Sequence, residues 1–299
     1  MNKEVMYIII SGILWGIIAI FVKGLSSMGF TSIEIVALRV WFSAICLIIF
    51  LLFKDYRLLK IKISDLWLFI GTGLVSIVFF NYCYFYTISK CSISIAAFLL
   101  YTAPVIVMIL SVLILKEKMN ISKSISLIMA CVGLAFITGV IGYAKLVQTR
   151  IIIIGIGAGF GYAMYSIFGK LLVSKYNAYT ITTYTFIVAS IGISPLISPV
   201  SIVKKTIDFS AIYNDIGVSI LCTVLPFLLY TKALEKEDSG KASIIATVEP
   251  IVATIIGVAI YNEKITVSKL VGIVLIIFSI VVLNIKVKNK KEYTKLDIY

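Results

Sequence analysis

One apolar segment occurs twice in this chain, at residues 94–118 and again at residues 240–264. When one copy is shifted onto the other by 146 positions, Pro104 aligns with Pro250. Each copy begins with small residues, contains a proline near its middle and ends with an acid beside a lysine. The apolar part of each copy is about 20 residues long, enough for a helix to cross a bilayer. The sequence therefore predicts a duplicated transmembrane helix that a proline interrupts.

The composition supports a membrane protein. Of the 299 residues, 61% are hydrophobic and 14% are charged, whereas a soluble domain is near half apolar and a quarter charged. The net charge of +13 would suggest a nucleic-acid partner in a soluble protein. Here the lysines gather in short gaps between apolar runs, which is the orientation signal of a membrane protein. We therefore expect the protein to be embedded in a lipid bilayer and to bind no nucleic acid.

Ten apolar runs bounded by charged or turn residues can be counted along the chain. They fall near residues 5–23, 32–53, 65–88, 93–115, 122–143, 150–173, 178–199, 215–234, 241–261 and 267–286. The connections are short, so no soluble domain is inserted, and the charged residues 287–299 form a predicted cytoplasmic tail. The predicted fold class is an all-α integral membrane protein with ten transmembrane helices.

Lysine and arginine are distributed unequally between alternate connections. A large majority of those outside the runs lie in the connections on the side of the N-terminus. The positive-inside rule then places both termini in the cytoplasm of a multi-pass protein, which we assign to the plasma membrane.

The repeat extends over the whole chain. With an offset of 147, Lys23 of the first run aligns with Lys170 of the sixth. Residues 1–143 thus form a first repeat of five spans and residues 150–286 a second. Because five is odd, the second repeat must enter the membrane from the opposite side. Two inverted halves with broken helices at matching positions are typical of secondary transporters, whose site lies near the midplane between the halves.

Several polar, aromatic and small residues follow one another in a particular order: Trp15-Gly16, Lys23, Arg39, Pro104 with Glu117, and Glu249-Pro250 with Glu263. In this order, and in its repeat period, the chain resembles the EamA-type transporters of the drug/metabolite transporter superfamily. The resemblance covers nearly the whole chain. It implies ten helices around a central cavity and movement of small metabolites, often export of amino acids, amines or related compounds.

The second half departs from the first at two positions. Tyr162-Ala163 stands where the first half has Trp15-Gly16, and Phe186 stands where a second Arg39 would fall. We therefore expect an asymmetric cavity.

The two prolines are predicted to break their helices. Each lacks an N–H, so the carbonyl four residues earlier, that of Leu100 or Ala246, loses its helical partner. Within a bilayer such a carbonyl is tolerated where another group or cavity water satisfies it. Because Pro104 and Pro250 recur at matched positions, we interpret them as hinges of two gating helices that line the path. The alternative is an ordinary tolerated kink.

Glu249 is the acid most directly suggested for function. It lies about eight residues into the ninth run, roughly 12 Å below the surface at 1.5 Å per residue. A carboxylate at the centre of a helix in the bilayer costs roughly 2.5–3.5 kcal/mol on insertion scales. It should face the interior and bind a substrate amine or carry a coupling proton. The alternative is a structural acid that pairs with a lysine or caps freed backbone.

Arg39 lies about seven residues into the second run, roughly 10 Å from the opposite face. Its guanidinium suits a carboxylate, which it can bind as a two-pronged fork. A helix-to-helix tie to a carbonyl, or to an acid such as Glu34, is equally compatible with the sequence. Glu34 itself lies near a helix start, where a carboxylate suits the helix dipole, and we expect it to cap that helix.

An aromatic stretch, F-F-N-Y-C-Y-F-Y, occupies residues 79–86 of the third run. Asn81 and Tyr84 lie three residues apart and share a helix face. A cavity wall suited to an amphipathic or cationic small molecule would be completed by Tyr101, Trp15, Tyr162 and Tyr165. Packing or interface-belt aromatics are the alternative interpretation.

Cofactor and enzyme motifs are not indicated. The chain has no histidine, its five cysteines show no C-x-x-C spacing, and residues 155–161 fail the dinucleotide pattern, so we predict neither metal nor cofactor. Those glycines are instead spaced for close helix packing.

The leading hypothesis is a secondary transporter of a small organic metabolite, an exporter that works by alternating access. A coupling proton and a monomeric or homodimeric state are compatible with it. The alternatives are an intramembrane enzyme, for which no G-x-S-x-G or H-E-x-x-H motif is present, and a non-transporting membrane assembly protein. A passive scaffold would not need the buried charges of Glu249 and Arg39.

Overall fold

The computed structural model describes residues 2–140, 147–206 and 208–284. Over these residues it contains ten helical segments long and apolar enough to cross a membrane. They are Lys3–Ser27, Ser32–Leu59, Ile63–Lys90, Ile93–Leu113, Ile121–Thr138, Thr149–Val173, Ala178–Leu196, Phe209–Leu234, Ser239–Tyr261 and Val267–Asn284. The predicted all-α class with ten spans is confirmed. The predicted tail at residues 287–299 lies outside the described residues, as does the predicted end of the first repeat at residue 143.

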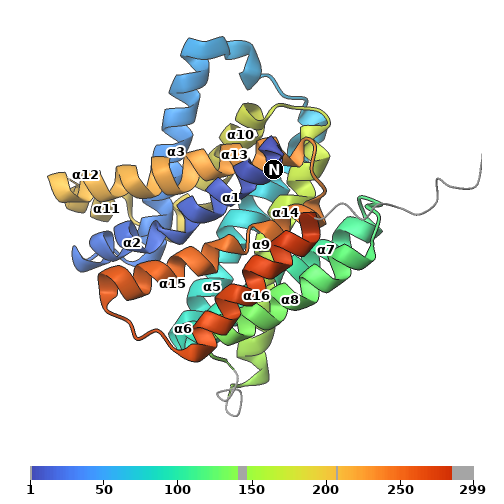
Figure 1. Ribbon diagram of the computed structural model, residues 1–299. Helices are drawn as coiled ribbons and strands as arrows, with labels where there is room; N and C mark the ends of the chain where they lie inside the picture. The colour runs from blue at the N-terminus through green and yellow to red at the C-terminus, as the bar shows by residue number, and fades with distance from the viewer. Residues whose placement is uncertain (1, 141–146, 207, 285–299) are drawn as a thin grey trace, which may run out of the picture.

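Several spans are built from more than one helix (Figure 1). In the first half, the first span consists of α1 (Lys3–Gly16) and α2 (Ile18–Ser27), and the second of α3 (Ser32–Asp55) and η1 (Tyr56–Leu59). The third span consists of η2 (Ile63–Asp65), α4 (Leu66–Ile70), η3 (Gly71–Phe79) and α5 (Phe80–Lys90). The fourth span consists of α6 (Ile93–Leu100) and α7 (Ala103–Leu113), and the fifth is α8 (Ile121–Thr138). In the second half, the sixth span is α9 (Thr149–Val173), and the seventh consists of α10 (Ala178–Ile193) and η5 (Ser194–Leu196). After the connecting helix α11 (Pro199–Thr206), the eighth span consists of α12 (Phe209–Ile216), η6 (Gly217–Val224) and α13 (Leu225–Leu234). The ninth span consists of α14 (Ser239–Ile245) and α15 (Val248–Tyr261), and the tenth is α16 (Val267–Asn284).

Short polar side chains set where helices begin. Thr31 and Glu34 form a capping box at the start of α3, in which each side chain accepts from the other residue's backbone N–H. This confirms the capping role expected for Glu34, which also pairs with Lys205 at 2.8 Å. Asn120 caps α8, and Gly139 ends that helix in the left-handed conformation at φ 66° that glycine adopts without strain.

A π-helix interrupts the third span and the eighth at matched positions. η3 begins at Gly71 and η6 at Gly217, which are 146 residues apart, the period of the sequence repeat. In each, a side-chain hydroxyl donates to a carbonyl five residues earlier: Ser76 to Gly71 at 3.1 Å, and Thr223 to Val218 at 2.8 Å. The wider turn of a π-helix shifts which residues share a face, and such turns are frequent at functional sites.

The fourth and ninth spans are each broken in the middle, as the prolines predict. α6 gives way to α7 at Tyr101 and Thr102, and α14 gives way to α15 at Ala246 and Thr247. Pro104 lies in the first turn of α7 and Pro250 in the first turn of α15, where a missing N–H costs no helical hydrogen bond.

The two halves exchange their packing partners. α1 of the first half packs against α13 and α15 of the second, whereas α9 of the second half packs against α5, α6 and α7 of the first. The last helices of the halves, α8 and α16, lie side by side along their length (Figure 1). Neither half therefore has a core of its own.

Glycines make this exchange possible by letting backbones approach. A Cβ on Gly12 of α1 would lie 3.3 Å from the Ala246 carbonyl oxygen, and one on Gly159 of α9 would lie 3.1 Å from that of Leu100. Ala246 begins the break in the ninth span, and Leu100, the matched residue, directly precedes the break in the fourth. The close helix packing predicted from the glycine spacing is thus confirmed, and each glycine seats one half's helix against the other half's break.

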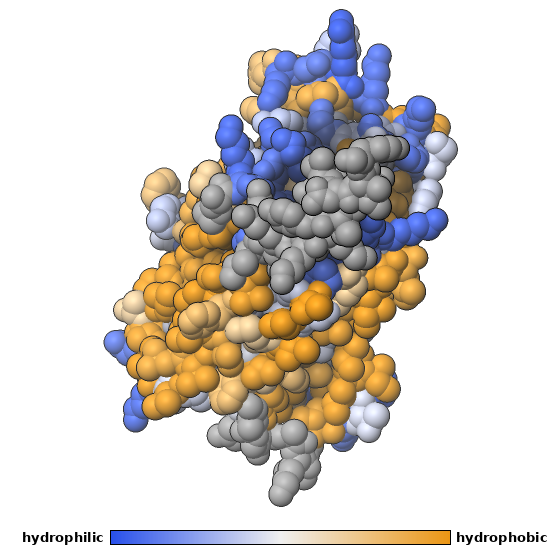
Figure 2. Space-filling view, turned by 45° about the vertical axis from the view of Figure 1, so that its right-hand side comes forward, coloured by the Kyte–Doolittle hydropathy of each residue, from blue (hydrophilic) through white to orange (hydrophobic). Residues whose placement is uncertain are grey.

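Polar contacts gather at the two ends of the spans. We call the end that holds residues 2–4, 55–65, 114–120, 174–177 and 235–238 the N-terminal face, and the other end the opposite face. At the N-terminal face the end of the fourth span meets the start of the ninth, because Glu117 binds the backbone of Ser239. Matched spans of the two halves therefore run in opposite directions, as expected for inverted repeats. Figure 2 shows hydrophilic residues gathered at one end, above a broad hydrophobic belt.

Candidate functional site

A cavity of about 590 Å³ lies between the two halves. The eight residues predicted from the sequence to form the binding site all line it: Trp15, Arg39, Asn81, Tyr84, Tyr101, Tyr162, Tyr165 and Glu249. Their position in one cavity is a structural fact, whereas their roles stay predictions. Pro104 and Pro250 do not line the cavity and lie in the first turns of their helices.

Glu249 is the second residue of α15, directly after the break in the ninth span. Its carboxylate accepts a hydrogen bond of 3.0 Å from the hydroxyl of Tyr162 on α9. A carboxylate in the first turn of a helix is also favoured by the helix dipole. The break therefore gives a membrane-buried acid both a hydrogen-bond donor and a suitable electrostatic position.

The break also satisfies its own backbone. As expected, Pro250 offers no N–H to the Ala246 carbonyl, and another group satisfies that carbonyl instead. The Ala246 carbonyl accepts from the Glu249 N–H at 3.0 Å, a tighter turn that replaces the lost helical bond. The same residue thus closes the break with its backbone and faces the cavity with its side chain.

Arg39 lies in the first third of α3, about two turns from its start, and its side chain lines the cavity. Its Nε atom is buried and has no hydrogen-bond partner among the residues that the structure describes. Its charge lies close enough to the Glu249 carboxylate for the two to attract each other. The side chain as a whole lines the cavity, where a guanidinium can bind a carboxylate.

The aromatic wall is centred on Trp15. Its ring packs edge-on against Tyr162 and Phe227, with ring centroids 6.4 and 5.3 Å away. Tyr162 also packs edge-on against Phe80 at 5.5 Å, and Tyr84 stacks on Phe80 at 6.0 Å. Rings in this arrangement present both apolar edges and electron-rich faces, which suit an amphipathic or cationic solute.

Two tyrosine hydroxyls of the cavity are already engaged by the protein. The Tyr165 hydroxyl lies 2.6 Å from that of Thr231, and the Tyr230 hydroxyl lies 2.8 Å from that of Ser166. Both pairs link α9 to α13. We infer that these tyrosines shape the wall through their rings.

Asn81 is likewise bound to backbone. Its Nδ2 donates to the Ile77 carbonyl at 2.7 Å, within the turn that follows the π-helix η3. Its side chain is 6% exposed, so the part that faces the cavity is small.

Several cavity residues were not predicted from the sequence. Ser76 and Ile77 reach the cavity from the π-helix η3, which the apolar pattern of the third run does not reveal. Phe227 and Tyr230 of α13 also line it. Tyr230 aligns with Tyr84 at the repeat offset, so the repeat itself is the signal that could have found it.

The cavity leads toward the opposite face. Its outer part is lined by residues at the ends of the first and third spans and the starts of the second and fourth: Lys23, Ser32, Ile88, Ser89 and Ile93. The Lys23 ammonium lies 3.2 Å from the centre of the Tyr261 ring, a cation–π contact at this mouth. The described structure is therefore the state in which the cavity faces the opposite side.

Comparison with known proteins gives a consistent picture. The model of the EamA-like transporter family matches residues 2–139 and again residues 149–285. Two uncharacterized transporters of Archaeoglobus fulgidus are similar, one 30% identical over 63% of this chain and 67% of its own length, the other 26% identical over 92% and 94%. The uncharacterized transporter YojE of Bacillus subtilis is 24% identical over 90% and 89%.

A solved crystal structure shares the fold. It superposes with a TM-score of 0.77 over 94% of this chain and 96% of its own, at 13% sequence identity. The two matched domains and the ten spans, together with these relatives, establish that the chain is a membrane transporter of the EamA-like family, in the drug/metabolite transporter superfamily.

Proposed function

We propose that this transporter is a secondary active exporter of small organic solutes that carry an amino group, such as amino acids, amines or related compounds. The observation that carries the proposal is the position of Glu249. It is a carboxylate in the middle of a membrane span, on the wall of a solute-sized cavity between two inverted halves. Ionisable residues inside a membrane usually mark a substrate or ion path.

The residues of the cavity divide into three roles. Glu249 binds the amino group of the solute or carries a coupling proton, with the Tyr162 hydroxyl holding its carboxylate. Arg39 binds an acceptor such as a carboxylate, and its position on the cavity wall supports this role. The rings around Trp15 enclose the apolar part of the solute.

Transport requires the cavity to open alternately to the two faces. The lysine distribution puts the N-terminal face in the cytoplasm, so the described state faces outward across the plasma membrane. Two inverted halves that rock about a fixed site provide the means. The breaks at Pro104 and Pro250 give the fourth and ninth spans their hinges.

The proposal can be tested with purified protein in proteoliposomes. Vesicles are loaded with single amino acids and amines, and uptake of the same labelled solute by exchange is compared with that of empty vesicles. We expect at least one amino-bearing solute to exchange. Glu249→Gln should reduce its rate about 10- to 100-fold, since a hydrogen bond to a charged group is worth about 1.5–3 kcal/mol.

Glu235→Gln is the matched control, because Glu235 is an exposed acid on the N-terminal face. It should exchange the solute at the wild-type rate. Wild-type exchange by Glu249→Gln at every pH would show that Glu249 neither binds charge nor carries a proton. A pH gradient that leaves the net flux of wild-type protein unchanged would exclude proton coupling and leave the binding role.

A further inference from the structure

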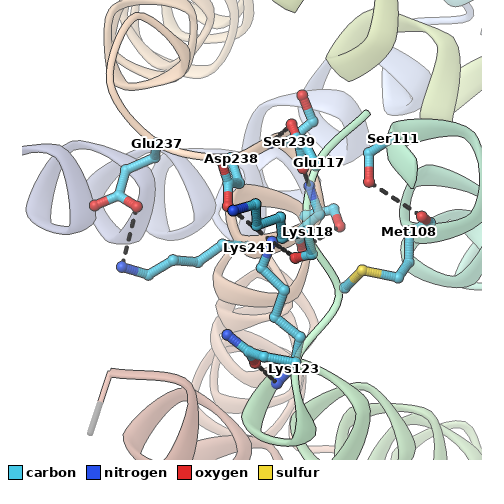
Figure 3. A network of polar contacts seen from close by, with 12 residues as sticks. Met108, Ser111, Glu117, Lys118, Lys123, Glu237, Asp238, Ser239 and Lys241 are labelled. Atoms are coloured by element: carbon cyan, nitrogen blue, oxygen red, sulfur yellow. Dashed lines mark hydrogen bonds and ion pairs between the residues drawn. The ribbon is translucent and has the colours of Figure 1, made fainter. Parts of the chain in front are cut away.

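A group of polar contacts closes the N-terminal face (Figure 3). The carboxylate of Glu117, just beyond the end of α7, accepts from the backbone N–H groups of Ser239 at 2.6 Å and Gly240 at 3.1 Å. These are the first two residues of α14. A glutamate of the first half thus caps the ninth span of the second half, using two charge-assisted hydrogen bonds.

Two lysines complete this closure. Lys170 of α9 donates to the carbonyl oxygens of Leu234 at 2.6 Å and Glu237 at 2.8 Å, at the end of the eighth span. Lys123 of α8 forms an ion pair of 2.7 Å with Asp238, and Figure 3 shows the two meeting beside Glu117. Lys123 is 5% exposed, so the pair is shielded from water on the lysine side. We call Glu117, Lys123 and Lys170, with these partners, the inner latch.

The repeat places the same residue types at the opposite face. Glu117 aligns with Glu263 and Lys123 with Lys269 at the offset of 146, and Lys170 aligns with Lys23 at 147. At 146, the atoms that the inner latch binds correspond to the backbone N–H groups of Ile93 and Ser94 and to the carbonyls of Ile88 and Cys91. The opposite face therefore contains every backbone group and every long side chain needed for a second latch.

That second latch is not formed in the described state. Glu263 pairs with Lys269 at 3.1 Å, and Lys23 lies over the ring of Tyr261. The backbone segments that they would bind, around Ile88 and Ile93, instead line the open mouth of the cavity. The matched acid and lysines are thus bound to their backbone partners at the N-terminal face and separated from the matching partners at the opposite face.

We propose that Glu263 and Lys23 form an outer latch in the alternate state, in which Glu263 caps α6 at Ile93 and Ser94 and Lys23 binds the carbonyls of Ile88 and Cys91. This inference rests on the alternating access of the proposed function. When the outer latch closes, the inner latch opens, and the cavity faces the N-terminal side. Each state gains the contacts that the other loses, so the two states stay close in free energy.

The two latches differ at one position. Asp238, the partner of Lys123, aligns with Ser92, which offers no charge to Lys269. The inner latch therefore has an ion pair that the outer one lacks. This difference favours the state with the inner latch closed, which is the state that the structure describes.

Hydrogen–deuterium exchange of the full-length protein in nanodiscs, without solute, tests the proposal. Glu117→Gln weakens the inner latch. Exchange should become about tenfold faster in a peptide that spans residues 236–246, and at least twofold slower in one that spans residues 88–96, at the far side of the membrane. Glu235→Gln is the control and should leave both peptides as in the wild type.

Ser92→Asp provides a second test, made at the opposite face, that leaves the residues of the inner latch unchanged. It supplies the missing acid for Lys269 and should also slow exchange at residues 88–96 and speed it at residues 236–246. If either variant folds and changes exchange at its own face alone, Glu117 is a static cap and the latch proposal fails.

The outcome is separate from that of the solute screen, because the exchange experiment contains no solute. Coupled changes at both faces without any transported solute would overturn the proposed substrate class and keep the latches. Transport without coupled changes would overturn the latches and keep the transporter.

Discussion

The two halves share their backbone plan but differ in the charges that they bring to the cavity. Both have a broken span, a π-helix and a glycine that seats the other half's break. The cation comes from the first half, as Arg39, and the acid from the second, as Glu249. At the repeat offsets their counterparts are Phe186, fully buried and packed edge-on to Phe227, and Ala103, which is 2% exposed.

The difference lies in the polar groups at the two breaks. The break of the fourth span brings Tyr101 to the cavity, whereas the break of the ninth span brings the carboxylate of Glu249. At the position that matches Glu249 the first half has Ala103, a buried residue of the hydrophobic core, so the second break carries a charge and the first does not. Apart from Lys23 at its mouth, the asymmetric cavity expected from the sequence thus has a cation from one half and an acid from the other, which suits a solute with two unlike charged ends.

The largest effect is expected when both charges are removed. Arg39→Gln and Glu249→Gln should each slow solute exchange by about 10- to 100-fold, since each loses a charge-assisted hydrogen bond of about 1.5–3 kcal/mol. If they hold different ends of one solute, the double variant should show the product of the two losses. Exchange rates of the two single variants and the double variant provide the measurement.

Arg57→Gln, at an exposed arginine of η1, is the control and should transport normally. A double variant no worse than either single one would mean that Arg39 and Glu249 mainly neutralise each other.

A smaller effect, on stability, is expected from alanine substitutions at the matched glycines Gly12 and Gly159, and it should differ between them. Gly159→Ala should destabilise the protein by about 1–3 kcal/mol, because its Cβ would lie 2.9 Å from the Leu99 carbonyl oxygen and would overlap the Thr102 hydroxyl. Gly12→Ala should be near neutral, because its closest contact is 3.3 Å and alanine favours the helix by about 1 kcal/mol. Thermal unfolding in detergent measures both, and equal losses would mean that the two seats are equally tight.

The smallest effect is expected at the prolines. Pro104→Ala and Pro250→Ala should each slow exchange by no more than about threefold, because first-turn positions need no proline to lose their N–H partners. The breaks are also held by Thr102 and Thr247, whose hydroxyls donate to carbonyls three residues earlier at 2.7 and 2.6 Å. A complete loss of transport in either variant, with unfolding temperature unchanged, would show that the proline itself is the hinge.

Much of this arrangement could be predicted from the sequence. The ten spans follow from the apolar runs, and the duplicated proline segments correctly predict two broken helices. Glu249 and Arg39 stand out because a charge inside an apolar run must face something polar. The cavity then follows from the pairing of the halves.

Other features could not be predicted in this way. The π-helix η3 brings Ser76 to the cavity, but its residues read as an ordinary apolar helix because an extra residue per turn leaves no compositional mark. The hydrogen bond between Glu117 and the backbone of Ser239 could not be predicted from the sequence either. The residues around Glu117 do not indicate a partner in the other half, because the contact depends on how the fourth and ninth spans meet.

The exchange of packing partners has a consequence for how such a chain can be divided. A half made alone would leave the groove beside its broken span uncovered, since the helix that fills it belongs to the other half. A copy inserted in the same direction would present the wrong end to that groove. Only a copy inserted in the opposite direction fits. Two separate chains would therefore need opposite orientations in the same membrane, whereas here both halves belong to one chain.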